Sequence, residues 1–121
     1  MKKTVMLKKK YEFKMLFSRG KIYYGSNLTM YIFKNKLNVN KLGIAIGKKS
    51  GKAVDRNRMK RLIKENYRLI EDSLKCGYHI LFSVNKRCQI EKVDFYLVQN
   101  EMKRLIKKSE IWLESNEENC N

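Results

Sequence analysis

Hydrophobic residues recur every three or four positions, the spacing of an α-helix, in three segments of the chain: residues 10–18, 53–74 and 93–107. In the first segment Phe13, Leu16 and Phe17 fall on one face, and Gly20 follows as a stop signal. On this periodicity alone, the two phenylalanines are predicted to belong to the core. The spacing therefore predicts three amphipathic helices, each with one face turned toward a core.

Three shorter segments are predicted to be strands: residues 28–33, 42–46 and 78–84. The first alternates between two faces, so that Leu28 and Met30 point one way and Tyr31 points the other. A polar loop separates it from the second strand, and the pair is interpreted as an antiparallel hairpin. The third strand is apolar and β-prone along its length, which is typical of a central strand.

The second predicted strand has one bulky face and one nearly bare face. Leu42, Ile44 and Ile46 share the first, whereas Gly43 and Ala45 line the other. A face without side-chain bulk leaves room for something to lie against the sheet.

The order helix, hairpin, helix, strand, helix predicts an α+β fold, an α/β sandwich in which helices cover a small mixed sheet. The chain has no internal repeat and no Gly/Ser linker, so residues 1–108 are expected to form one domain. Residues 109–121 contain four acids and neither Lys nor Arg, and are interpreted as an acidic C-terminal tail.

Positive charge dominates the predicted domain. The chain holds 28 Lys and Arg against 12 Asp and Glu, a formal net charge of +16. All 28 cations lie in the first 108 residues, together with eight of the acids. A body with so much charge of one sign repels itself, so it is expected to meet a polyanion. Nucleic acid is the first candidate and an anionic membrane surface the second.

The cations concentrate in one stretch, where nine of them face only two acids: Lys48, Lys49, Lys52, Arg56, Arg58, Lys60, Arg61, Lys64 and Arg68. On a helix, one arc of this stretch is apolar and includes Met59, Leu62, Ile63, Tyr67 and Ile70. The opposite arc is polar and comprises Asn57, Lys60, Arg61, Lys64 and Arg68. Arginines can fork onto phosphate oxygens. The pattern therefore predicts a helix that binds nucleic acid.

The turn before this helix, GKKSGKAV, is rich in glycine and lysine. It lacks the G-x-x-x-x-G-K-[ST] spacing of a nucleotide-binding loop, so an NTP site is not expected. Its lysines and the free amides at the helix start can still contact a phosphate backbone.

The remaining reactive side chains give neither a catalytic pattern nor a metal-binding one. Cys76, Cys88 and Cys120 form no CxxC pair, and they are expected to be reduced thiols in a cytoplasmic protein. His79 lies in an apolar strand, where a structural role is expected. No carboxylate pair or Cys/His cluster accompanies it, so no catalytic residue and no protein metal site are predicted.

The string KAVDRNRMKRLIKENYR, residues 52–68, resembles the signature of the bacterial ribonuclease P protein family. Its R-N-R core stands at Arg56, Asn57 and Arg58, and a K-R pair follows. A short helix with two phenylalanines one turn apart and a strand containing MYIF precede it, in the order that the family has. Asp55, just before the R-N-R core, and the acidic tail depart from the family pattern.

The resemblance implies a protein that binds a large catalytic RNA and helps it remove the 5′ leader of precursor tRNA. It also implies a ribosomal protein S5 domain 2-like fold, with a left-handed crossover between the strands at residues 42–46 and 78–84. The cleavage chemistry would belong to Mg²⁺ ions bound mainly by the RNA. The protein would then be a cofactor of the enzyme, with no DNA or membrane partner.

Two groups of residues are implied as binding sites. The leader would lie in a cleft formed by Phe13, Phe17, Tyr31, Arg56, Asn57, Lys60 and Lys64. The catalytic RNA would contact Lys48, Lys49, Lys52, Arg58, Arg61 and Arg68.

Other classes of protein share parts of this pattern. A ribosomal or ribosome-associated protein would carry a similar fold and charge. A DNA-binding helix-turn-helix fits less well, because both connections of the basic helix run through strands. A membrane-surface protein would need an apolar outward arc on that helix, which this sequence lacks.

Overall fold

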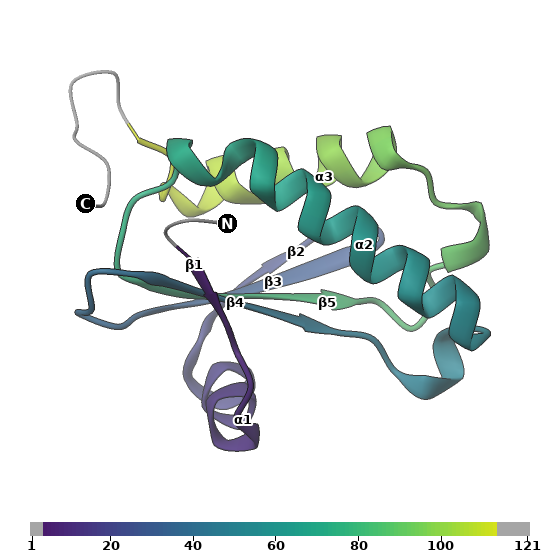
Figure 1. Ribbon diagram of the computed structural model, residues 1–121, viewed down its shortest axis with the longest axis horizontal. Coiled ribbons are helices and arrows are strands. Elements are labelled where there is room, and N and C mark those ends of the chain that lie inside the picture. The colour runs from purple at the N-terminus through teal and green to yellow at the C-terminus, as the bar shows by residue number, and fades with distance from the viewer. Residues whose placement is uncertain (1–3, 114–121) are drawn as a thin grey trace.

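A mixed five-stranded sheet with helices on both faces forms the body of the protein, in a computed structural model that describes residues 4–113 (Figure 1). The strands are β1 (Thr4–Met6), β2 (Lys21–Tyr24), β3 (Leu28–Lys34), β4 (Asn40–Ala45) and β5 (Tyr78–Val84). The helices are α1 (Lys10–Arg19), α2 (Ala53–Ile70) and α3 (Phe95–Ser109). Three short 3-10 helices connect them: η1 (Lys48–Ser50), η2 (Glu71–Ser73) and η3 (Ile90–Lys92). The predicted α+β sandwich is confirmed.

The predicted hairpin between the strands at 28–33 and 42–46 is wrong. The strand order is β1-β4-β5-β3-β2, so β5 lies between β3 and β4, antiparallel to the first and parallel to the second. The physical reason is burial: β5 has buried residues on both faces, and only a central strand is covered on both. The antiparallel partner of β3 on its other side is β2, a short and largely exposed edge strand that the hydrophobic pattern does not reveal.

The sheet separates two cores of unequal size. Helix α1 covers one face, and α2 and α3 lie side by side over the other (Figure 1). Alternation along β5 directs Ile80 and Phe82 to the larger core and Leu81 to the smaller one. Leu81 packs there with Leu7 and with Leu16, the buried apolar residue of α1. Alternation along this strand, whose sequence predicts only an apolar central strand, therefore supplies side chains to both cores.

Side chains of the protein itself pack against the bare face of β4 at Gly43. A β-carbon added at Gly43 would lie 2.7 Å from Leu7 Cδ1, 2.9 Å from Leu81 Cδ1 and 3.1 Å from Phe13 Cε1. The clearance predicted from Gly43 is thus filled by Leu7, Leu81 and the α1 residue Phe13. Two residues further along, Ala45 borders an open hollow instead.

The connection from β4 through α2 to β5 joins neighbouring parallel strands, as the resemblance implies. The left hand of this crossover remains an expectation. Helix α2 ends at Ile70, four residues earlier than the periodicity predicts, because η2 tightens the last turn.

The folded body extends beyond the expected boundary at residue 108. Helix α3 continues to Ser109, and Ile111 is only 2% exposed. The backbone then pairs with the segment before β5, where Lys75 N donates to Ile111 O at 2.7 Å and Leu113 N donates to Ser73 O at 2.8 Å. Residues 109–113 are therefore part of the domain, since apolar Ile111 is buried with the core. The rest of the predicted acidic tail, 114–121, lies outside the described residues.

The expectation of three reduced thiols is wrong for Cys76, which is disulfide-bonded in the structure. Cys88 is a free thiol buried in the larger core. Spacing along the sequence does not reveal which thiols approach one another, because that depends on the folded chain.

Replacing Gly43 by Ala is expected to destabilise the protein by about 1–3 kcal/mol, because the new methyl group overpacks the contact between α1 and the sheet. Urea unfolding measures this loss. Gly47→Ala is the matched control, since a β-carbon there meets nothing closer than Ser50 Oγ at 3.6 Å. Equal stability of the two variants would contradict the packing argument.

Candidate nucleic-acid interface

Helix α2 divides into a buried arc and a basic arc, as its sequence predicts. Met59, Ile63 and Tyr67 are fully buried against the sheet. The polar arc is exposed along its whole length: Asn57, Lys60, Arg61, Lys64 and Arg68. Because the apolar arc packs against the core, these side chains face solvent.

Two arginines of the R-N-R core are turned partly inward, which their sequence pattern does not reveal. Arg56 Nη1 donates to Lys48 O at 2.7 Å and to Gly51 O at 2.8 Å. Arg58 Nη2 donates to Val93 O at 2.6 Å, and its Nη1 donates to Ile90 O at 3.3 Å. Both side chains are half-buried and tie a neighbouring loop to α2. The loop carbonyls of Ile90 and Val93 therefore hold part of the Arg58 guanidinium, and its contact with RNA stays a prediction.

Arg68 and Glu65 form an exposed pair on the same helix. Arg68 Nη2 lies 2.7 Å from Glu65 Oε2, and Arg68 Nε donates to the same oxygen at 3.1 Å. An exposed pair of this kind contributes at most about 1 kcal/mol. The guanidinium can therefore exchange its carboxylate partner for a phosphate at little cost.

The lysines before α2 gather around a second hollow. Lys48 and Lys49 of η1 line it together with Gly47, Ser50 and Lys86, and its volume is about 510 Å³. Lys52, the residue before the first turn of α2, is also exposed. Lys86 was missed by the sequence reasoning. The signal that could have identified it is the N-K-R triplet directly after β5.

An open cleft of about 490 Å³ lies where β4 and β5 end, between α1 and α2. Its lining combines one aromatic ring with two cations and no carboxylate: Phe17, Ile44, Ala45, Ile46, Gly47, Ser50, Lys60, Ser83, Val84 and Lys86. Phe17 is 44% exposed, so the prediction that periodicity places it in the core is wrong. Its ring packs edge-on against Tyr31, with centroids 4.9 Å apart.

The structure brings together only part of the predicted leader site. Phe17 and Lys60 line the cleft, and Tyr31 supports Phe17. Phe13 packs at Gly43 instead, in the smaller core. Lys64 lies in a different hollow, with Arg61, Glu65 and Arg68. Arg56 and Asn57 are absent from the residues that line the cleft.

Comparison with known proteins identifies the family. The model of the family described as Ribonuclease P matches residues 1–110. The ribonuclease P protein component of Thermoanaerobacter sp. (strain X514) is 39% identical over 111 residues, which cover 92% of this chain and 94% of that protein. The chain belongs to the ribonuclease P protein family.

Further members of the ribonuclease P protein family agree in sequence and in fold. The protein component of Clostridium kluyveri is 40% identical over 108 residues, which cover 88% of this chain and 95% of that protein. The solved structure of the ribonuclease P protein of Thermotoga maritima has a TM-score of 0.77 at 28% identity and covers 85% of this chain and 96% of its own. That of Staphylococcus aureus, at 24% identity, shares the fold with a TM-score of 0.80 and covers 89% and 97%.

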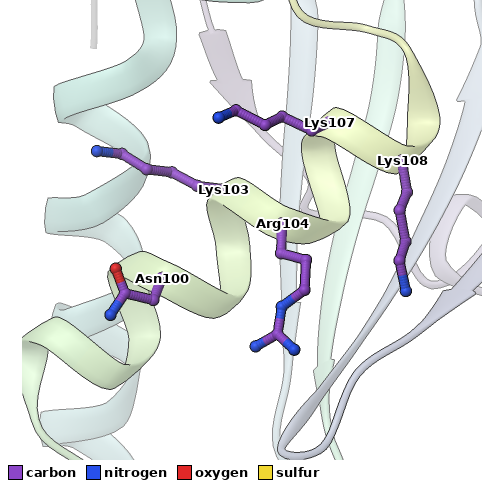
Figure 2. A pocket seen from close by; sticks show the side chains of 5 residues that line it. All are labelled: Asn100, Lys103, Arg104, Lys107 and Lys108. Atoms are coloured by element: carbon purple, nitrogen blue, oxygen red, sulfur yellow. The ribbon is translucent and has the colours of Figure 1, made fainter.

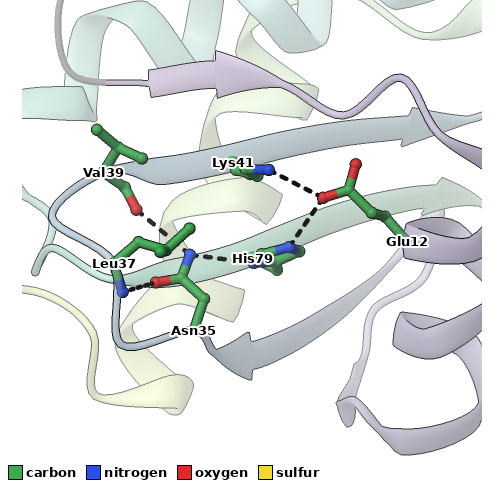
Figure 3. A network of polar contacts seen from close by, with 6 residues as sticks. All are labelled: Glu12, Asn35, Leu37, Val39, Lys41 and His79. Atoms are coloured by element: carbon green, nitrogen blue, oxygen red, sulfur yellow. Dashed lines mark hydrogen bonds and ion pairs between the residues drawn. The ribbon is translucent and has the colours of Figure 1, made fainter.

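A buried polar network joins α1 to the sheet in this member of the family (Figure 3). Glu12 Oε2 accepts from Lys41 Nζ at 3.0 Å and lies 3.2 Å from His79 Nε2. Asn35 Nδ2 lies 3.0 Å from His79 Nδ1, while Asn35 Oδ1 accepts from Leu37 N at 2.7 Å. The predicted structural role of His79 is confirmed, whereas the network around Glu12 was not foreseen.

The orientation of the Asn35 amide determines which ring nitrogen of His79 bears the hydrogen. Because Asn35 Oδ1 accepts from a backbone amide, the amide nitrogen Nδ2 faces His79 and donates to Nδ1. Nδ1 is then an acceptor, and the hydrogen on Nε2 points to the Glu12 carboxylate. Burial raises the pKa of Glu12, but hydrogen bonds from Lys41 and His79, together with the charge of Lys41, outweigh it, so the net pKa is lowered.

Two further findings bear on the class of protein. Within residues 4–113, no three side chains of the His, Cys, Asp and Glu types come together as they would to hold a metal ion. None of the helices described in the structure combines the length and apolarity that crossing a bilayer requires.

Stability is expected to fall on acidification as the Glu12 carboxylate gains a proton. A carboxyl whose folded pKa is lowered stabilises the protein above its usual pKa of 4.5, and this contribution is lost as the pH falls through the folded pKa. Glu12→Gln should therefore lower the free energy of unfolding at pH 7 by about 1–3 kcal/mol and weaken its decline between pH 7 and pH 3. Denaturant titrations at several pH values measure both effects.

The exposed Glu91 provides the control, since Glu91→Gln should change neither quantity. An acid-induced decline in Glu12→Gln as large as in the unsubstituted protein would show that the stabilising carboxylate lies elsewhere.

Proposed function

We propose that this ribonuclease P family member binds the catalytic RNA of the enzyme and the 5′ leader of precursor tRNA, and so assists removal of the leader to give the mature tRNA 5′ end. The cleft at the ends of β4 and β5 carries the proposal. An exposed ring, a small floor residue and two lysines line it, and no acid dilutes their charge. These are the features that bind a single strand without strong sequence preference.

Each part of the cleft has a task in this proposal. Phe17 offers a ring on which an unpaired base of the leader stacks, worth about 1–3 kcal/mol per base. Tyr31 holds that ring from the side through its edge contact. Lys60 and Lys86 stand where they neutralise the leader's phosphates. Ala45 keeps the floor low, since a larger side chain there would fill the cleft.

The catalytic RNA is assigned to the outward arc of α2 and to the turn before it. Arg61, Lys64 and Arg68 stand in one row along α2. Lys48, Lys49 and Lys52 continue the positive surface at the start of the helix. Arg56 and Arg58 take part by holding the loops on either side, since their guanidinium groups donate to loop carbonyls.

In this proposal the RNA performs catalysis and holds the Mg²⁺ ions, which supply the attacking group and stabilise the leaving oxygen. No step is assigned to a metal held by the protein. The protein brings leader and RNA together and reduces the repulsion between their phosphates. A cytoplasmic location belongs to the same proposal, because precursor tRNA is the proposed substrate of the enzyme. The ribosomal alternative has no feature in its favour beyond fold and charge.

Replacing Phe17 by Ala should weaken the binding of precursor tRNA to the reconstituted holoenzyme by roughly fivefold to a hundredfold, because one base loses its stacking surface. Mature tRNA, which has no leader, should bind as before. Equilibrium binding of both tRNA forms measures the difference.

Tyr11→Ala is the matched control, because Tyr11 is an aromatic residue on the same helix, 65% exposed and outside the cleft lining. An equal loss of affinity for both tRNA forms in Phe17→Ala would contradict the assignment of the cleft to the leader.

Arg61 and Arg58 are expected to behave differently when each is replaced by Ala. Arg61 is exposed, so its loss should leave stability unchanged, weaken holoenzyme assembly and reduce the salt dependence of assembly by about one phosphate contact. Loss of Arg58 should destabilise the fold by about 1–3 kcal/mol, because the carbonyls of Ile90 and Val93 lose their donor. Urea unfolding, together with RNA binding at several salt concentrations, separates the two effects. Similar profiles for both variants would be evidence against this division of roles.

A further inference from the structure

A second basic surface lies on α3 and consists of residues that have no role in the proposed function. Five side chains of this helix line a shallow hollow of about 600 Å³: Asn100, Lys103, Arg104, Lys107 and Lys108. Lys103 and Lys107 extend to one side of the helix, and Arg104 and Lys108 extend to the other (Figure 2). We call these four cations the α3 basic face.

The acidic residue of α3, Glu101, does not lie on this surface. Glu101 is only 2% exposed, and its Oε1 accepts from Asn27 N at 2.6 Å and from Leu28 N at 2.7 Å. Its Oε2 accepts from Asn27 Nδ2 at 3.1 Å. The negative charge therefore fixes the loop before β3, and the outward side of the helix carries cations alone.

No protein group neutralises the α3 basic face within the part of the chain that the structure describes. None of its four cations has a carboxylate oxygen within ion-pair distance there. The acid that comes near is Glu110, which lines the neighbouring hollow together with Lys107. Four unpaired cations on one helix repel one another, so the fold gains little from having them together.

The helix dipole accounts for only half of these charges. Lys107 and Lys108 stand in the last turn of α3, where cations stabilise the carbonyl end of a helix. Lys103 and Arg104 stand one turn earlier, and the dipole effect fades beyond the last turn. Their position needs another explanation, which a phosphate ligand supplies.

We infer that the α3 basic face is a second contact for the catalytic RNA, made through the phosphate backbone. This inference rests on the proposed function. Helices α2 and α3 lie side by side on one face of the sheet, so one large RNA can meet both (Figure 1). The leader cleft is built at the ends of β4 and β5, whereas α3 packs over β2 and β3. A single-stranded leader bound in the cleft therefore does not run along α3.

The double variant Arg104→Gln/Lys108→Gln tests the inference, because both side chains are exposed and face the same side of the helix. Binding of the full chain to the catalytic RNA is measured over a range of KCl concentrations. The expected result is roughly tenfold weaker binding near physiological salt, with a salt dependence reduced by about two phosphate contacts.

Lys34→Gln/Lys36→Gln is the matched control, since it removes the same charge from an exposed region outside all the surfaces assigned above. It should change affinity less than twofold. Thermal unfolding of both variants verifies that the fold is intact. If the double variant unfolds, the single variant Arg104→Gln, which lies farther from the helix end, takes its place.

Equal binding by the α3 variant and the control would overturn the inference and leave the proposed function standing. A loss confined to tRNA binding by an otherwise normal holoenzyme would overturn the assignment to the catalytic RNA. Failure of the unsubstituted chain to bind the catalytic RNA would overturn the proposed function itself.

Discussion

Burial of one arc of α2 against the sheet is the interaction on which the rest of the structure depends. Met59, Ile63 and Tyr67 leave water completely, and each such side chain contributes about 1.5–3 kcal/mol. Tyr67 also lies 2.7 Å from Thr4 Oγ1, which connects the helix to the edge strand β1, and burial raises the pKa of its hydroxyl to about 12. With that arc fixed, the cations of the opposite arc must face solvent. A strongly charged surface thus becomes a consequence of how the core forms.

The R-N-R segment acts on two levels. Its arginines look like contacts for RNA, yet Arg56 and Arg58 donate to backbone carbonyls at both sides of the helix. They position η1 and η3, and with them the lysines and the β5 end that border the cleft. In the proposed function, direct contact with RNA is assigned to neighbours with exposed side chains, such as Lys60 and Lys86. A motif can therefore be tied to function through the geometry that it maintains.

The two faces of the sheet support different parts of the proposed binding surface. On the side of α1, a small core and the network around Glu12 hold one helix in place, so that Phe17 stands exposed at the cleft. On the other side, α2 and α3 lie side by side (Figure 1), and both carry exposed cations. Glu12 and Glu101 are both buried as hydrogen-bond acceptors. Removing these carboxylates from the surface strengthens the positive field that a polyanion meets.

The sequence by itself determined the three helices, three of the five strands and the outward basic arc, because these depend on periodicity within a few residues. It also carried the family signature around Arg56. Only the tertiary structure decided that β5 separates β3 from β4, that Phe13 packs inward while Phe17 stays exposed, and that Arg58 serves a loop. It alone joined Glu12 to His79, 67 positions apart. Such outcomes depend on which distant surfaces compete for burial and hydrogen bonds, and no local pattern records that competition.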